Sequence, residues 1–243
     1  MMVQACINGA RPADYHPALP LTAEQMANDA KQCVIVGAAE IHLHIRDRNL
    51  TETLSAAEVD RTIALVRSAC PGTLLGISTH EEIENDASRT LSCIRQWRVL
   101  PNYASVNLSE AAALAVMKQL TDCHIGIEAG LGSVADAERL CASGYLSRVF
   151  RILIEIEQQD TAEALAIVAG IERVLLNAGN YRPLLLHGYD ATIWPLIALA
   201  REKGYSTRVG LEDGERLPDG DRAGNNAALV SAALACPAYP YRS

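Results

Sequence analysis

Short runs of β-branched and aliphatic residues alternate with longer amphipathic stretches along the whole chain. The apolar runs have the length of buried strands, which predicts strands at Val3–Ile7, Glu40–Ile45, Thr73–Ser78, Ala104–Asn107, His124–Glu128, Val149–Ile154, Pro183–His187 and Ser206–Gly210. Between them, apolar positions at helical spacing predict helices at Thr22–Val36, Ser55–Ser68, Ser109–Leu120, Ser133–Ala142, Thr161–Leu176 and Ala191–Lys203. Capping residues mark several helix starts, at Thr22, Ser55 and Ser133.

This alternation predicts an α/β fold. Eight units of about thirty residues each give the size of a (β/α)8 TIM barrel of about 250 residues. We therefore expect a single barrel domain over residues 1–243. An open doubly wound sheet shares the alternation, but no GxGxxG motif follows the first strand, and Asn8-Gly9-Ala10 alone does not indicate a dinucleotide site.

Composition narrows the class of protein. The 243 residues carry a net charge of −8, which argues against nonspecific nucleic-acid binding, because such binding needs a basic face. Apolar residues make up 49% of the chain and aromatic residues only 5%, so the core must be aliphatic. No apolar run approaches the ~18–20 residues of a membrane span, and the N-terminus lacks the basic start of a signal peptide.

The cysteines point to a reducing compartment. All seven stand singly, with no CxxC motif and an odd total, so a disulfide framework is not indicated. We interpret them as small buried apolar residues and expect a cytoplasmic protein.

The candidate chemistry lies at predicted strand ends, where TIM barrels carry their active sites. In Glu40–Ile45, side chains alternate between two faces, so His42 and His44 project to one side, about 6–7 Å apart along the strand. Two imidazoles at this spacing can converge on one metal ion; the alternative is a pair of hydrogen-bonded interior histidines.

A third metal ligand is available after the last predicted strand. Because the first, second and eighth strands are neighbours in a closed barrel, Glu212 could complete a set of two histidines and one carboxylate. Without the histidines, Glu212-Asp213-Gly214 would read as an ordinary solvated turn. Arg208, near the end of the same strand, could pair with Asp213 and favour its ionised form, unless it is a surface arginine of the barrel rim.

The ordered motifs resemble the β-keto acid cleavage enzymes. The resemblance runs through most of the chain and is carried by Ala5-Cys6-Ile7-Asn8-Gly9-Ala10, Leu19-Pro20-Leu21-Thr22, His42-Leu43-His44-Ile45-Arg46-Asp47, Ser78-Thr79, Ser105-Val106-Asn107, Arg208-Val209-Gly210-Leu211-Glu212-Asp213 and Asn225-Asn226-Ala227. An early HxHxRD motif followed by a late RxGxED motif is a specific combination.

The resemblance implies a zinc-dependent TIM-barrel enzyme that condenses a β-keto acid with acetyl-CoA and releases acetoacetate and an acyl-CoA through a metal-stabilised enolate. It implies that the zinc ligands are His42, His44 and Glu212. It further implies Asp213 as the general base, Arg208 as the residue that orients it, and Glu128 as another active-site carboxylate. Ser78 and Ser105 match substrate-holding positions, and we expect the neighbouring Thr79 and Asn107 to contribute. A homo-oligomer, perhaps a tetramer, is also implied.

Three departures from the family pattern bear on the substrate. Arg11 stands where the family commonly has an acid, which predicts an anionic substrate end read by this arginine. His80-Glu81-Glu82 replaces a glycine pair after the third strand. After the sixth strand, an acidic segment that includes Glu155 and Glu157 replaces the glycine-rich loop of the CoA-binding side, and two carboxylates there would repel a pyrophosphate.

Three functions therefore compete. The first is the metal-dependent cleavage of a small anionic β-keto acid with acetyl-CoA. The second keeps the metal but not CoA, as a lyase, aldolase or hydrolase on the same barrel. The third is an inactive barrel that binds a small acid or a partner, and the intact His42, His44, Glu212 and Asp213 set argues against it.

Overall fold

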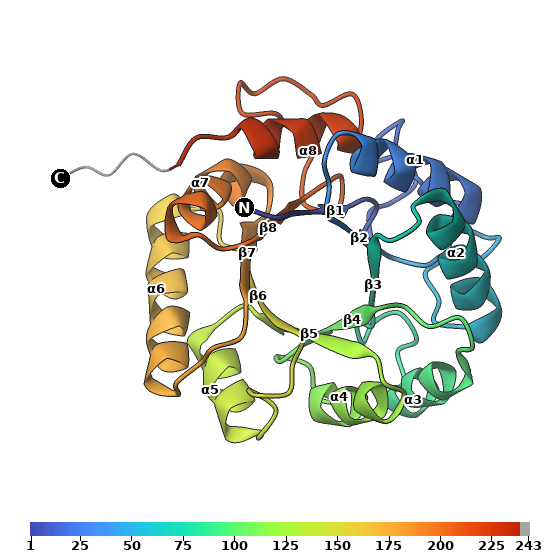
Figure 1. The fold of residues 1–243 in the computed structure, drawn as a ribbon, viewed down its shortest axis with the longest axis horizontal. Coiled ribbons are helices and arrows are strands. Elements are labelled where there is room, and N and C mark those ends of the chain that lie inside the picture. Colours follow the sequence, from blue (N-terminus) through green and yellow to red (C-terminus); the bar gives the residue numbers. More distant parts are fainter. Residues whose placement is uncertain (239–243) are drawn as a thin grey trace.

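Eight parallel strands surround one axis and helices form the outer ring, as the sequence predicts (Figure 1). The structure, a computed structural model, describes residues 1–238; residues 239–243 of the predicted domain lie outside the described part. The strands are β1 (Val3–Cys6), β2 (Glu40–Leu43), β3 (Leu74–Ser78), β4 (Tyr103–Asn107), β5 (Gly126–Leu131), β6 (Arg151–Ile156), β7 (Leu184–Gly188) and β8 (Thr207–Val209). The α-helices are α1 (Ala23–Ile35), α2 (Ala56–Ala69), α3 (Ala87–Gln96), α4 (Ala113–Asp122), α5 (Val134–Ala142), α6 (Thr161–Asn177), α7 (Ile193–Lys203) and α8 (Asn226–Ala235).

Strand pairing makes the sheet a nearly closed barrel rather than an open doubly wound sheet. Ladder hydrogen bonds join the strands in the order β7-β6-β5-β4-β3-β2-β1-β8. Between β7 and β8, the Leu186 N–H donates to the Ser206 carbonyl and the Ser206 N–H donates to the Leu184 carbonyl, both at 3.0 Å. Consequently β8 lies between β7 and β1, and the ends of β8, β1 and β2 are neighbours.

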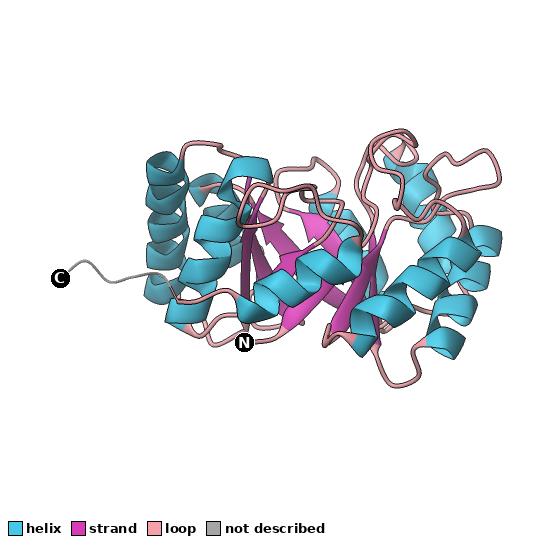
Figure 2. Ribbon diagram, turned by 90° about the horizontal axis from the view of Figure 1, so that it is seen from above, coloured by secondary structure: helices cyan, strands magenta, loops and turns pink. Residues whose placement is uncertain are grey.

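The two faces of the barrel wall have opposite polarity. Residues that point outward, such as Ile41, Leu75 and Ile152, belong to the continuous aliphatic core under the helices. Residues that alternate with them point inward, and many of these are polar and fully buried. Seen from the side, the strands run from the end where the chain begins toward the end with the longer loops (Figure 2).

A buried ionic layer crosses the barrel interior. The Arg151 side chain, 4% exposed, donates from Nη2 to Glu40 Oε2 at 2.7 Å and from Nε to Glu128 Oε2 at 2.8 Å. Gln4 connects the layer further, because its Nε2 donates to the Tyr103 hydroxyl at 2.7 Å and to Glu128 at 3.2 Å. Each charged group in this layer therefore has an opposite charge beside it, as burial requires.

The helices differ from the prediction in several places. Helix α3 is absent from the predicted set, helix α8 is anticipated only by the Asn225-Asn226-Ala227 motif at its start, and α4 begins at Ala113 rather than at Ser109. At the predicted starts, the Thr22 and Ser133 side chains accept backbone N–H groups as caps, whereas Ser55 makes no side-chain cap. Within residues 1–238, no helix has the combined length and hydrophobicity of a membrane span.

The buried ionic layer gives a testable stability effect. Arg151→Met should lower the free energy of unfolding by about 3–5 kcal/mol, because Glu40 and Glu128 would remain buried without their cation. Urea unfolding at neutral pH measures this loss. Arg148→Met, which changes an exposed arginine just before β6, is the matched control and should cost less than about 1 kcal/mol. Equal losses in the two variants would contradict a stabilising role for the layer.

Candidate active site

A cavity of about 610 Å³ opens at the C-terminal ends of the strands. Loops and strand ends from around the barrel line it, which is the position at which TIM barrels place their chemistry. The lining residues relevant to the site are Arg11, His44, Glu52, His80, Asn107, Gly130, Glu155, Glu157, Tyr189, Asp190 and Glu212.

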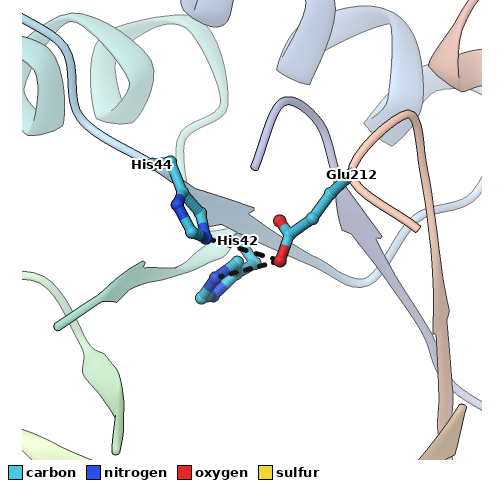
Figure 3. A group of neighbouring side chains, drawn as sticks. All are labelled: His42, His44 and Glu212. Carbon is cyan, nitrogen blue, oxygen red and sulfur yellow. Dashed lines mark ion pairs between the residues drawn. The ribbon is translucent and has the colours of Figure 1, made fainter. Parts of the chain in front are cut away.

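Two histidines and a glutamate converge beside this cavity, and His44 and Glu212 line it. Ligand atoms of His42, His44 and Glu212 all lie within 4.8 Å of one another, and the three residues are largely buried (Figure 3). Glu212 Oε1 is 3.9 Å from His42 Nε2 and 3.4 Å from His44 Nε2. The predicted alternation of the second strand and the predicted closeness of the eighth strand thus produce this cluster.

Hydrogen bonds to the backbone fix the positions of the cluster. The Asn8 side chain, which follows β1, donates to the His44 carbonyl at 2.8 Å and accepts the His44 N–H at 2.9 Å. Asn226 at the start of α8 accepts the Leu211 N–H at 2.7 Å and donates to the Ile7 carbonyl at 2.8 Å. Both segments that carry the cluster are therefore fastened to the chain that follows β1.

The side chain of Glu52 orients His44. Its Oε1 forms a short hydrogen bond with His44 Nδ1, which leaves Nε2 directed at Glu212. An antiparallel bridge between Arg46 and Glu52 brings the loop back to this position. A carboxylate on the second nitrogen of a histidine is the usual support of a metal-binding imidazole.

The pKa shifts of His42, His44 and Glu212 show that the cluster is a favourable environment for a positive charge. Burial lowers the pKa of His42 to about 3, so its imidazole is neutral and can donate a lone pair. Burial acts in the same direction on His44, but the carboxylates of Glu212 and Glu52 outweigh it and raise the His44 pKa to about 9. Although burial opposes ionisation of Glu212, Arg208 and the two histidines hold its pKa well below the usual range.

The donor set fits a divalent metal ion. Glu212 Oε2 and His42 Nδ1 are buried and have no hydrogen-bond partner among the described residues. Two imidazoles and one carboxylate are the ligand set of catalytic zinc sites, which keep a position open for substrate. His42, His44 and Glu212 are the residues that would hold such an ion, with Glu52 as the supporting group.

Arg208 connects the candidate metal ligand to the candidate base. Its Nη2 donates to Glu212 Oε1 and to Asp213 Oδ1, both at 2.8 Å, and its side chain is 2% exposed. Burial raises the pKa of Asp213, and Arg208 acts in the opposite direction. The second oxygen of this carboxyl, Oδ2, is buried and has no hydrogen-bond partner among the described residues.

The family model described as beta-keto acid cleavage enzyme matches residues 1–238 of this chain. The chain belongs to this family. Among curated proteins it is similar to the 3-keto-5-aminohexanoate cleavage enzyme of Fusobacterium nucleatum subsp. nucleatum, with 24% identity over 247 residues, which cover 95% of this chain and 88% of the relative. An enzyme of the same name from Acetoanaerobium sticklandii is 32% identical over 80 residues, which cover 32% of this chain and 29% of the relative.

Solved structures share the fold at low identity. ObcA, in a ternary complex with a C4-CoA adduct and oxalate, has a TM-score of 0.72 at 16% identity, and the match covers 88% of this chain and 62% of ObcA. This chain thus spans less than two thirds of the ObcA chain. A type I 3-dehydroquinate dehydratase from Clostridium difficile has a TM-score of 0.64 at 12% identity, covering 96% of this chain and 92% of that one.

The polar residues at the ends of β3 and β4 do not all line the cavity. Asn107 lines it. The Thr79 hydroxyl instead donates to the Ser105 carbonyl at 2.7 Å, and the Ser78 hydroxyl accepts the His80 N–H at 3.2 Å. Ser78, Thr79 and Ser105 are at most 9% exposed. Of the four substrate contacts predicted at these two strand ends, Asn107 is therefore the one that lines the cavity.

Glu128 does not reach the cavity, which corrects its predicted place at a strand end. Strand β5 continues to Leu131, so Glu128 lies in mid-strand, fully buried in the ionic layer with Arg151. The strand end is instead occupied by Gly130, which lines the cavity.

Arg11 lines the cavity, but its donors are directed at the chain itself. Its Nε donates to the Glu212 carbonyl at 3.0 Å and its Nη2 to the Asp213 carbonyl at 3.2 Å. The guanidinium also lies 3.8 Å from the Asp190 carboxylate and stacks on the Tyr15 ring. This geometry favours a clamp on the segment of Glu212 and Asp213 over recognition of a second substrate carboxylate.

Four side chains near the site received no catalytic, substrate-binding or metal-binding role in the prediction: Glu52, Glu155, His187 and Tyr189. Glu155 and His187 lie at the C-terminal ends of β6 and β7. Because TIM barrels carry their active sites at these ends, correct strand limits are enough to identify both residues as candidates. Glu52 is not at a strand end, so its position in the sequence does not indicate a role. Its contact with His44 forms because the loop after β2 turns back and pairs with Arg46.

The contact between Glu52 and His44 gives a test of the metal site. Glu52→Gln should weaken zinc binding by about 10–100-fold, because the carboxylate supports the basicity and orientation of His44. Titration of the metal-free protein with zinc against a competing chelator measures the affinity. Glu58→Gln on α2 removes the same charge outside the cavity and should leave the affinity unchanged. An unaltered affinity in Glu52→Gln would exclude the supporting role.

Proposed function

We propose that this protein cleaves a β-keto acid by condensing it with acetyl-CoA, which yields acetoacetate and an acyl-CoA. The observation that carries the proposal is the arrangement of Arg208, which holds the Glu212 carboxylate of a His-His-Glu cluster and the Asp213 carboxylate side by side. Membership of the family supports the reaction class. The reaction is a retro-Claisen acyl transfer, in which the carbon–carbon bond next to the ketone breaks.

The first chemical step requires removal of a proton from the carbon between the ketone and the carboxylate of the substrate. Asp213 is the base, and its free Oδ2 is the atom that takes the proton. Arg208 fixes the other oxygen and keeps the carboxylate directed. Burial of Asp213 removes competing water, and its raised pKa makes it a stronger base than an exposed aspartate.

A divalent metal, when bound, supplies the Lewis acid that stabilises the negative charge of the enolate and orients the substrate oxygens. We propose zinc, because two histidines and a carboxylate form one of its catalytic ligand sets, although manganese and cobalt accept similar ligands. His42, His44 and Glu212 would hold the ion. Resemblance to the family further suggests a homo-oligomer, which size-exclusion chromatography with light scattering would measure.

A second candidate is a metal-dependent lyase, aldolase or hydrolase that does not use CoA. The specific observation in its favour is the acidic end of β6, where Glu155 and Glu157 both line the cavity. Carboxylates in this position would repel the phosphates of CoA if the cofactor approached along β6. Family membership favours the CoA-dependent reaction over this one.

One assay separates the candidates. Zinc-loaded protein is incubated with a panel of β-keto acids, with and without acetyl-CoA, and acetoacetate and acyl-CoA are quantified by mass spectrometry. We expect stoichiometric formation of both products, only with acetyl-CoA present, and loss of activity and of bound metal in the His42→Ala/His44→Ala double variant. His124→Asn, an exposed histidine at a positive φ that Asn tolerates, is the matched control.

The alternatives have distinct outcomes in the same assay. Cleavage at the same rate without acetyl-CoA would support the second candidate. Absence of turnover for every compound, in protein that retains its metal, would overturn both enzymatic functions.

A further inference from the structure

A carboxylate on the outer ring of the barrel contacts the residue that holds the segment of Glu212. Asp29 lies in the middle of α1, and its Oδ2 accepts a hydrogen bond from Asn226 Nδ2 at 2.8 Å. The Cys33 thiol lies 3.9 Å from the same oxygen. Burial raises the pKa of Asp29 to about 6, and the groups among the described residues that oppose this shift are the Asn226 amide and the Cys33 thiol, neither of which is a cation. An ionised carboxylate here opposes folding at neutral pH, so stability alone does not account for Asp29.

The Asn226 amide joins three segments of the chain through its hydrogen bonds. Its Oδ1 accepts the Leu211 N–H at 2.7 Å. Its Nδ2 donates to the Ile7 carbonyl and to Asp29 Oδ2, both at 2.8 Å. Asn226 is fully buried, so each of its two N–H groups needs a protein acceptor. Without Asp29, one buried N–H group would lose its partner, and the amide would no longer be held in one position.

The chain after β1 and the chain after β8 are packed against each other with no spare room. A Cβ atom on Gly210 would overlap the Cys6 carbonyl oxygen. A Cβ atom on Gly9, where φ is +56°, would overlap Glu212 Cγ. The position of the Glu212 carboxylate relative to the two histidines therefore depends on the spacing between these two chains, which the Asn226 amide bridges.

We propose that Asp29 is a positioning residue for Glu212 and that it acts through the Asn226 amide. A charged acceptor gives a hydrogen bond roughly twice as strong as a neutral one, so the carboxylate holds this amide firmly. The fixed amide keeps the Leu211 N–H and the Ile7 carbonyl at a constant separation, and Glu212 stays beside the histidines. The role rests on the metal site of the proposed function and not on the reaction.

Zinc affinity, measured without turnover, tests this assignment. Asp29→Leu removes the acceptor and excludes water from its place, and it should weaken zinc binding to the metal-free protein by about tenfold, as measured by competition with a chelator. Asp29→Asn keeps an acceptor, because its Oδ1 can accept the same N–H group, and it should bind zinc within about threefold of the wild-type protein. Asn28→Leu places the same apolar side chain on the exposed face of α1 and should leave the affinity unchanged.

Hydrogen exchange followed by NMR separates local positioning from a loss of overall stability. In metal-free Asp29→Leu, the Leu211 amide should exchange at least about fivefold faster than in the wild-type protein, because its acceptor, Asn226 Oδ1, is no longer fixed. The Ile152 amide of β6, which donates to the Pro183 carbonyl, should exchange at the wild-type rate. Asp29→Ala, which adds no bulk to the site, should change zinc affinity and Leu211 exchange in the same direction.

The outcomes separate the role of Asp29 from the proposed reaction. Unchanged zinc affinity in both Asp29→Leu and Asp29→Ala would overturn the proposal, and so would exchange that becomes faster at Leu211 and Ile152 alike. If the expected losses occur but no β-keto acid is cleaved, the proposed reaction fails and the role of Asp29 stands. If the wild-type protein binds no zinc, the metal site and the role of Asp29 fail together.

Discussion

A single buried guanidinium, that of Arg208, sets the organisation of the site. It binds Glu212 and Asp213 at 2.8 Å each, and without it two adjacent carboxylates would be buried close together and would repel each other. With it, Glu212 stays ionised beside the two histidines, while Asp213 keeps one oxygen free. In the proposed function, these two neighbouring acids of the sequence therefore have different roles, Glu212 as a metal ligand and Asp213 as the base.

The barrel strands hold this arrangement in place, and the cavity lies at their C-terminal ends. The ladder between β8 and β1 places Arg208 beside Gln4 of β1, and Asn226 fastens the segment of Glu212 to the chain after β1. Deeper in the barrel, Arg151 is fully satisfied by two carboxylates, so that layer is structural.

The sequence predicted the barrel and the closeness of His42, His44 and Glu212 because both depend on strand periodicity and strand order. Alternation along a strand places His42 and His44 on one face, and closure of the barrel brings Glu212 to them. Glu128 was misplaced because the end of β5 depends on its pairing with β4 and β6, which composition does not reveal. Helix α3 was missed because six of its ten residues are polar, and only Thr90 and Ile94 are buried. The contacts of Arg11 and Glu52 are tertiary and carry no local signal.

Deuterium exchange tests most directly whether this site forms an enolate. A β-keto acid is incubated with zinc-loaded protein in D₂O without acetyl-CoA, and exchange at the carbon between its two carbonyl groups is followed by NMR. The account predicts exchange well above the uncatalysed rate, abolished by removing the metal and by Asp213→Asn in protein that still binds zinc. Exchange that persists in Asp213→Asn, or that never exceeds the uncatalysed rate with a compound the protein cleaves, would contradict it.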